Sequence, residues 1–159
     1  MAYTVPNIAV ISFPRTASKY LVNFQSKLYG FKPAEGVLHK PAFFGDSKNW
    51  ENMEEIVYGR KHVLHGHWHS LNKLPPDIYF YIKQNYEIVT SHRETKLVKD
   101  SVRRILNNKS ADHWYRFDTH WQELIDQTND EIKEWNISRR YVFSKNKIEI
   151  VDECPDNFI

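Results

Sequence analysis

The sequence predicts an α/β protein with three layers, in which helices cover both faces of a mainly parallel sheet. Two observations carry this prediction. Short apolar runs rich in β-branched residues alternate with segments whose apolar residues recur at helical spacing, and no repeat, low-complexity tract or long linker interrupts them. The chain also has 159 residues, the usual length of one domain. We therefore expect a single domain over residues 1–159.

The opening strand and helix are the clearest elements. Residues 7–13, NIAVISF, form an apolar run that ends at Pro14, as expected of a buried parallel strand. A helix is predicted at 16–29, because its apolar residues share one helical face: Tyr20, Leu21, Phe24 and Leu28. Gly30 ends this helix, and residues 32–45, which contain several prolines and glycines, are predicted to be a loop.

The remaining elements repeat the alternation of helix and strand. Helices are predicted at 49–58, 75–84, 95–107 and 115–135, strands at 62–68 and 86–91, and a strand or hairpin at 140–151. Ligands of such folds normally bind beyond the carboxyl ends of the strands. The segments that follow the predicted strands are therefore the expected place for a site.

Composition and charge restrict the classes of partner. Hydrophobic residues make up 41% of the chain and charged residues 26%, which is typical of folded proteins and excludes disordered, collagen-like and coiled-coil chains. The 22 Lys and Arg residues nearly balance the 20 Asp and Glu residues. This balance argues against a long nucleic acid or an anionic membrane as partner, so we expect any bound anion to be small and held locally. The sequence does not predict an oligomeric state.

Cysteine content and hydropathy indicate the compartment. Cys154 is the single cysteine, so no internal disulfide can form. No apolar run approaches the roughly 20 residues that span a bilayer, and the first residues lack the pattern of a signal peptide. We expect a cytoplasmic protein.

Three polar clusters follow predicted strands: SFPRTASK at 12–19, HGHWH at 65–69 and SHR at 91–93. The first places backbone N–H groups, two hydroxyls and two cations at the start of a helix, where an anion is favoured. This predicts a P-loop-like phosphate-binding turn after the first strand. The chain contains no G-x-x-x-x-G-K-[ST] motif, so the turn is not a Walker A loop. A helix capped by its own hydroxyls is the alternative interpretation.

Residues 12–21, SFPRTASKYL, resemble the T-Y-P-K-S-G-T-T-W-L loop of sulfotransferases, which transfer a sulfuryl group from 3′-phosphoadenosine 5′-phosphosulfate (PAPS). The resemblance implies that Arg15 contacts the 5′-phosphosulfate and stabilises the leaving phosphate. It implies that Tyr20 stacks on adenine. It also implies a loop around the 5′-phosphate made of Thr16, Ala17, Ser18 and Lys19. Ala17 stands where the family has glycine, and Lys19 stands where it has threonine.

Arg93 and Ser101, in RETKLVKDS, have the spacing of the 3′-phosphate motif of the same family. A forked guanidinium and a hydroxyl can hold a second phosphate. The resemblance therefore implies PAPS as donor, adenosine 3′,5′-diphosphate as product and no metal. The alternative is that Arg93 is an ordinary surface cation and Ser101 an incidental helix residue.

The histidine cluster resembles the K-T-H-L-P segment that carries the general base of the family. His67 aligns best with the base, His69 is the alternative, and His65 stands where the family has lysine. A neutral imidazole can accept a proton from a hydroxyl or amine near neutral pH. The alternation of His65, His67 and His69 also predicts that all three share one face of a strand, so a metal site and purely structural histidines remain alternatives.

The resemblance covers about residues 8–106, and the late R-K-G-x-x-G-D-W segment of the family does not occur in the 159 residues. The leading hypothesis is a compact, C-terminally shortened sulfotransferase that acts on a hydroxyl or amine of an unidentified acceptor. The alternative is a catalytically degenerate relative that serves as a nucleotide-binding or protein-interaction module.

Overall fold

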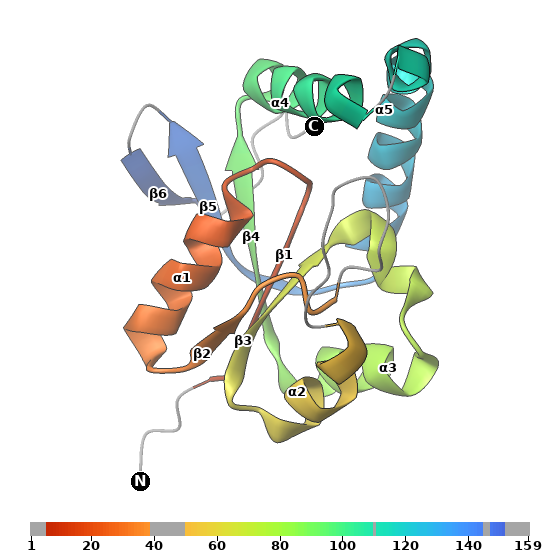
Figure 1. Ribbon diagram of the computed structural model, residues 1–159. Helices are drawn as coiled ribbons and strands as arrows, with labels where there is room; N and C mark the ends of the chain where they lie inside the picture. The colour runs from red at the N-terminus through yellow and green to blue at the C-terminus, as the bar shows by residue number, and fades with distance from the viewer. Residues whose placement is uncertain (1–5, 39–49, 110, 145–146, 152–159) are drawn as a thin grey trace, which may run out of the picture.

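Six strands form one sheet in a computed structural model that describes residues 6–38, 50–109, 111–144 and 147–151. The strands are β1 (Ile8–Ser12), β2 (Lys32–Ala34), β3 (His62–His67), β4 (Glu87–Arg93), β5 (Ile137–Ser144) and β6 (Lys147–Val151). Their order in the sheet is β2-β3-β1-β4-β5-β6 (Figure 1). The first five strands pair in parallel and β6 is antiparallel to β5. This confirms the predicted fold class.

In the part of the chain that the structure describes, five α-helices and two short 3₁₀ helices connect the strands. The α-helices are α1 (Ser18–Tyr29), α2 (Met53–Gly59), α3 (Pro76–Asn85), α4 (Thr95–Lys109) and α5 (Ala111–Ile132), and the 3₁₀ helices are η1 (Trp50–Asn52) and η2 (Trp68–Lys73). Gly30 ends α1 in the left-handed conformation and donates its N–H to Ser26 O, as the sequence predicts. Pro76 begins α3, a position where the missing N–H costs nothing.

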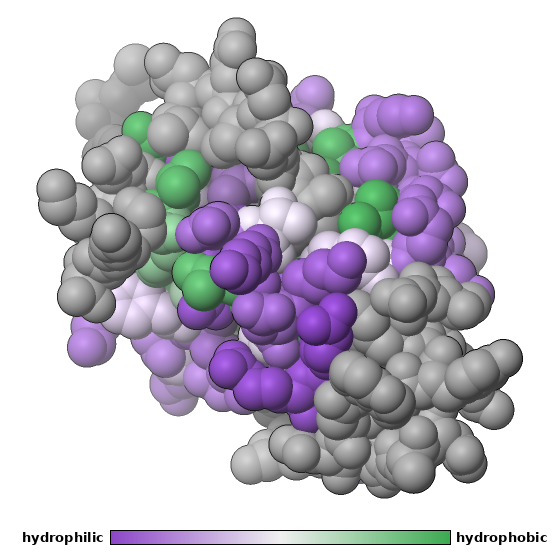
Figure 2. Space-filling model, turned by 90° about the horizontal axis from the view of Figure 1, so that it is seen from above, coloured by the Kyte–Doolittle hydropathy of each residue, from purple (hydrophilic) through white to green (hydrophobic). Residues whose placement is uncertain are grey.

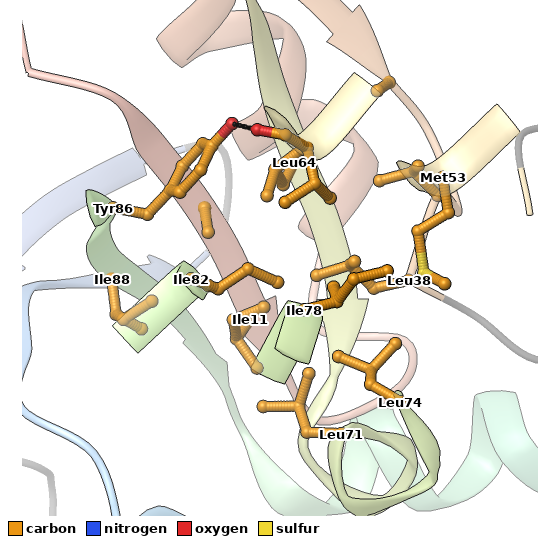
Figure 3. Packing of buried hydrophobic residues seen from close by; sticks show 14 of the residues in the cluster. Ile11, Leu38, Met53, Leu64, Leu71, Leu74, Ile78, Ile82, Tyr86 and Ile88 are labelled. Atoms are coloured by element: carbon orange, nitrogen blue, oxygen red, sulfur yellow. Dashed lines mark hydrogen bonds between the residues drawn. The ribbon is translucent and has the colours of Figure 1, made fainter. Parts of the chain in front are cut away.

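Alternate residues of β1 point to opposite faces of the sheet, and each face is covered. Ile8 and Val10 pack in one apolar cluster with Leu21 of α1. Ala9 and Ile11 belong to a larger cluster that contains residues of α2, α3 and η2. Figure 3 shows this larger cluster, in which the hydroxyl of Tyr86 donates a hydrogen bond of 2.7 Å to Val57 O. The helices therefore cover both faces of the sheet.

Three elements differ from the sequence-based expectation. Residues 32–34 form the edge strand β2, not a loop, because they pair with residues 62–64 of β3. Pro33 is tolerated there because an edge strand leaves one side without hydrogen bonds. Strand β3 ends at His67, so His69 lies in η2 and does not share the strand face of His65. Residues 140–144 and 147–151 lie in the antiparallel pair β5 and β6, but β5 begins earlier, at Ile137.

Within the ranges described above, no helix is long and apolar enough to cross a membrane.

Candidate anion-binding and catalytic site

The turn between β1 and α1 has an unusual backbone. Arg15 and Ala17 have φ values of 66° and 63°, in the left-handed region that favours glycine. This conformation costs a non-glycine residue about 1–2 kcal/mol. Such strain concentrates at functional sites, and left-handed residues in a turn can direct successive N–H groups toward one anion. The backbone at Ala17 thus has the conformation that the family's glycine would adopt freely.

The start of α1 has no side-chain cap. Ala17 occupies the N-cap position and makes no capping hydrogen bond through its side chain. The alternative interpretation, a helix capped by its own hydroxyls, is therefore wrong. The first N–H groups of a helix need an acceptor and carry a partial positive charge, so this end of α1 suits an anion.

The hydroxyl of Thr16 is buried and holds the turn together from inside. Thr16 Oγ1 lies 2.8 Å from Phe13 O and 2.8 Å from Ser91 Oγ on β4. A carbonyl oxygen can only accept, so the single hydrogen of Thr16 goes to Phe13 O and Ser91 must donate to Thr16. Only the backbone N–H of Thr16 remains for the phosphate contact that the family resemblance implies.

The structure brings the two predicted phosphate motifs together. Arg15 Nε donates to Ser101 Oγ on α4 at 2.8 Å, across 86 residues of sequence. Arg93 Nη1 at the end of β4 points to Arg15 O, at 3.4 Å. Ser101 is buried, whereas Arg15 is exposed and Arg93 is partly exposed. Two guanidinium groups are therefore gathered beside the turn, where they remain accessible to a ligand.

Lys19 and Tyr20 lie on the first turn of α1 and are exposed. Tyr20 is 56% exposed, and its ring meets the ring of Phe143 edge to face, at 5.7 Å between centroids. The carboxyl ends of β1 and β4 lie at the top of Figure 1, and Figure 2 views the molecule from that side. Hydrophilic residues gather in the centre of this face (Figure 2), which is consistent with an anion site there.

His65 is buried and both of its ring nitrogens are engaged. Its Nδ1 accepts a 3.0 Å hydrogen bond from the backbone N–H of Gly36, and its Nε2 lies 3.0 Å from Ser18 Oγ. A nitrogen that accepts from an N–H carries no proton, so the ring is neutral and its hydrogen is on Nε2. His65 is therefore not available to take a proton from a substrate.

His67 and His69 stack on each other, with ring centroids 5.7 Å apart and an interplanar angle of 17°. Burial, helped by Lys73, lowers the pKa of His69 to about 4, which makes it a weak proton acceptor. His67 ends β3 directly opposite Ser12 of β1. It also meets the ring of His65, at 5.6 Å between centroids. The sequence-based choice of His67 as general base therefore stays a prediction.

The arrangement of these histidines also bears on the alternative of a metal site. Among the described residues, no group of three His, Cys, Asp or Glu side chains is arranged to hold a metal ion. The expectation that the three histidines share one strand face is wrong, because β3 ends before His69.

Three residues of this region were not among the predicted site residues. Gly36 supplies an N–H to His65, and its φ of 67° lies in the left-handed region that glycine adopts without strain. Ser91 supports Thr16. Ser12 has a buried hydroxyl that finds no hydrogen-bond partner within the described part of the chain. Ser12 and Ser91 lie in polar clusters visible in the sequence, whereas nothing local marks Gly36.

Comparison of the sequence with protein-family models gives no match. Comparison with curated protein sequences gives none either. Among solved structures, the crystal structure of the YorR protein from Bacillus subtilis in complex with phosphorylated GDP is similar, with 12% sequence identity and a TM-score of 0.46 over 86% of this chain and 85% of YorR. Chains related at this level share too little to transfer a ligand or an activity.

Proposed function

We propose that the protein binds a nucleotide with phosphates at its 5′ and 3′ positions and transfers a sulfuryl group from PAPS to a hydroxyl or amine of an acceptor. The observation that supports this most is the 2.8 Å hydrogen bond from Arg15 Nε to Ser101 Oγ. It joins the turn after β1 to the motif of Arg93 and Ser101, and a ligand with phosphates at both ends of one nucleoside needs these two motifs side by side.

Different residues around the turn bind the 5′ end, the 3′-phosphate and the adenine of the donor. The N–H groups of the turn and of α1, together with Ser18, hold the 5′ end of the donor. Arg93 and Ser101 hold the 3′-phosphate, for which a forked guanidinium is well suited. Tyr20 is exposed and its aromatic ring stacks on the adenine. The net charge of the chain is only +2, so this attraction for the donor is local.

His67 accepts the proton of the acceptor hydroxyl or amine, whose oxygen or nitrogen forms a bond to sulfur. The bond between sulfur and the bridging oxygen of the 5′-phosphate breaks, and its electron pair stays on that oxygen. Arg15 and the N–H groups of the turn stabilise the charge that develops there, and adenosine 3′,5′-diphosphate leaves. As in phosphoryl transfer, the protein contributes positioning and electrostatic stabilisation.

Nucleotide binding tests the first half of the proposal. We expect adenosine 3′,5′-diphosphate to raise the melting temperature of the protein much more than AMP does. The preference should disappear in Arg93→Ala, which removes the 3′ contact. It should persist in Lys61→Ala. Lys61 is an exposed cation just before β3, at the end of that strand far from His67. Equal stabilisation of the wild type by both nucleotides would rule out the 3′ site.

Sulfuryl transfer tests the second half. Labelled PAPS is incubated with the protein and a panel of hydroxyl and amine acceptors. Transfer should be lost in His67→Ala and retained in His69→Ala, since burial lowers the pKa of His69 to about 4. Full activity of His67→Ala would remove His67 as the base. A protein that prefers the 3′,5′-diphosphate yet transfers nothing to any acceptor would instead be a nucleotide-binding relative.

A further inference from the structure

Two consecutive hydrogen bonds connect three separate segments at the edge of the site. The N–H of Gly36, just after β2, donates to His65 Nδ1 at 3.0 Å, and His65 Nε2 on β3 lies 3.0 Å from Ser18 Oγ at the start of α1. His65 is 1% exposed and Ser18 is 6% exposed. This chain of hydrogen bonds is therefore shielded from water and has a defined direction.

The direction follows from the chemistry of the donors. Gly36 N–H can only donate, so His65 Nδ1 accepts and the ring hydrogen sits on Nε2. His65 Nε2–H therefore donates to Ser18 Oγ, which acts as acceptor. Ser18 keeps its own hydroxyl hydrogen, and among the described residues His65 is the one hydrogen-bond partner of that hydroxyl.

The two hydroxyls of the turn thus have different roles. The hydrogen of Thr16 is donated inward to Phe13 O. The hydrogen of Ser18 remains available at the first residue of α1, next to the N–H groups that suit an anion. We propose that His65 is a positioning residue that turns the Ser18 hydroxyl so that its hydrogen is donated to the 5′-phosphate of the bound nucleotide. This inference rests on the proposed function for the identity of the ligand.

Two amide substitutions separate the two bonds of His65. In His65→Asn, the amide oxygen replaces Nδ1 and can accept from Gly36, but nothing reaches Ser18. In His65→Gln, the amide nitrogen replaces Nε2 and can donate to Ser18, but the acceptor for Gly36 is lost. A purely structural histidine predicts that ligand affinity falls in step with stability. If His65 positions Ser18, ligand affinity should fall in His65→Asn and stay near the wild-type value in His65→Gln, whatever the stability of each variant.

We expect His65→Asn to bind AMP and adenosine 3′,5′-diphosphate about three- to tenfold more weakly, by the same factor for both, because both carry the 5′-phosphate. His65→Gln should keep near wild-type affinity even where its melting temperature is lower. Ser18→Ala should lose about tenfold or more, and adding His65→Asn to it should cost no further affinity. Affinity of His65→Asn equal to that of the wild type, or losses in both variants that follow their stability, would overturn the inference.

A measurement without nucleotide checks the tautomer directly. The ¹⁵N chemical shifts of His65 in the free protein should show a protonated Nε2 and an unprotonated Nδ1, and the reverse would overturn the inference. Inorganic pyrophosphate, which lacks the nucleoside, serves as a third ligand for the variant series. If the wild type shows no preference for the 3′,5′-diphosphate over AMP, the proposed function fails, while the affinities of the variants for pyrophosphate and AMP still decide the role of His65. Absence of binding for all three ligands would overturn both.

Discussion

Replacing Gly66 by alanine should strain the strand that carries the histidines. Gly66 lies in β3 between His65 and His67, and a Cβ at this position would lie 2.9 Å from Leu38 Cβ, 3.2 Å from Leu38 Cδ1 and 3.3 Å from Ile11 Cδ1. Leu38 Cβ is attached directly to the backbone, so it cannot rotate away. The backbone of Leu38 is itself held, because its N–H donates to His65 O at 3.0 Å.

The magnitude follows from the cost of overpacking a buried site. One extra methyl group in a well-packed core costs about 1–3 kcal/mol, and the contact with a Cβ that cannot rotate places Gly66→Ala in the upper half of that range. For a chain of this size, the melting temperature should fall by about 4–12 °C. Gly59→Ala is the matched control, because Gly59 ends α2 with nothing within 4 Å of the added Cβ. Alanine there should be neutral or stabilising by up to about 1 kcal/mol.

Urea unfolding of both variants measures the difference in free energy of unfolding. If the segment around Leu38 retreats to make room, the bond from Gly36 to His65 should also weaken, so Gly66→Ala should bind nucleotide less tightly at a temperature where it is fully folded. Stability of Gly66→Ala equal to that of Gly59→Ala would refute the packing of Leu38 on β3 and with it the reasoning about His65.

The remaining predictions concern the turn and acid stability. Ala17→Gly should raise the free energy of unfolding by about 0.5–1 kcal/mol in urea melts, because it relieves a left-handed alanine at φ 63° at some entropic cost; a destabilised variant would contradict that conformation. Burial lowers the pKa values of both His69 and His92 to about 4, so each is neutral in the fold. Because these values lie below the unfolded value of about 6.5, the stabilisation is complete above pH 6.5 and is lost as pH falls toward 4, by roughly 3 kcal/mol per histidine. Urea melts at several pH values should show this decline in the free energy of unfolding, and the decline with pH should be less steep in His92→Gln. An equally steep decline in variant and wild type would show that the pKa of His92 is not lowered by folding.

The sequence was sufficient where the signal is local. The apolar run at 7–13 and the helical spacing at 16–29 predict β1 and α1 closely, because burial on one or both sides leaves a pattern in neighbouring residues. Strand β2 was missed for the opposite reason. Its three residues carry no pattern of their own and become a strand only by pairing with β3.

The same division holds within the candidate site. The sequence by itself determined which chemical groups are present, namely two guanidinium groups, two hydroxyls and a run of histidines after predicted strands. Thr16 and Ser18 are alike in that view. Only the tertiary structure decided their hydrogen bonds. Thr16 donates its hydroxyl hydrogen to Phe13 O inside the turn and accepts from Ser91, whereas Ser18 accepts from His65 and still has its hydroxyl hydrogen to donate. The physical reason is that Ser91 and His65 come from strands 75 and 47 residues away in sequence, and only the parallel pairing of those strands with β1 brings them beside the turn.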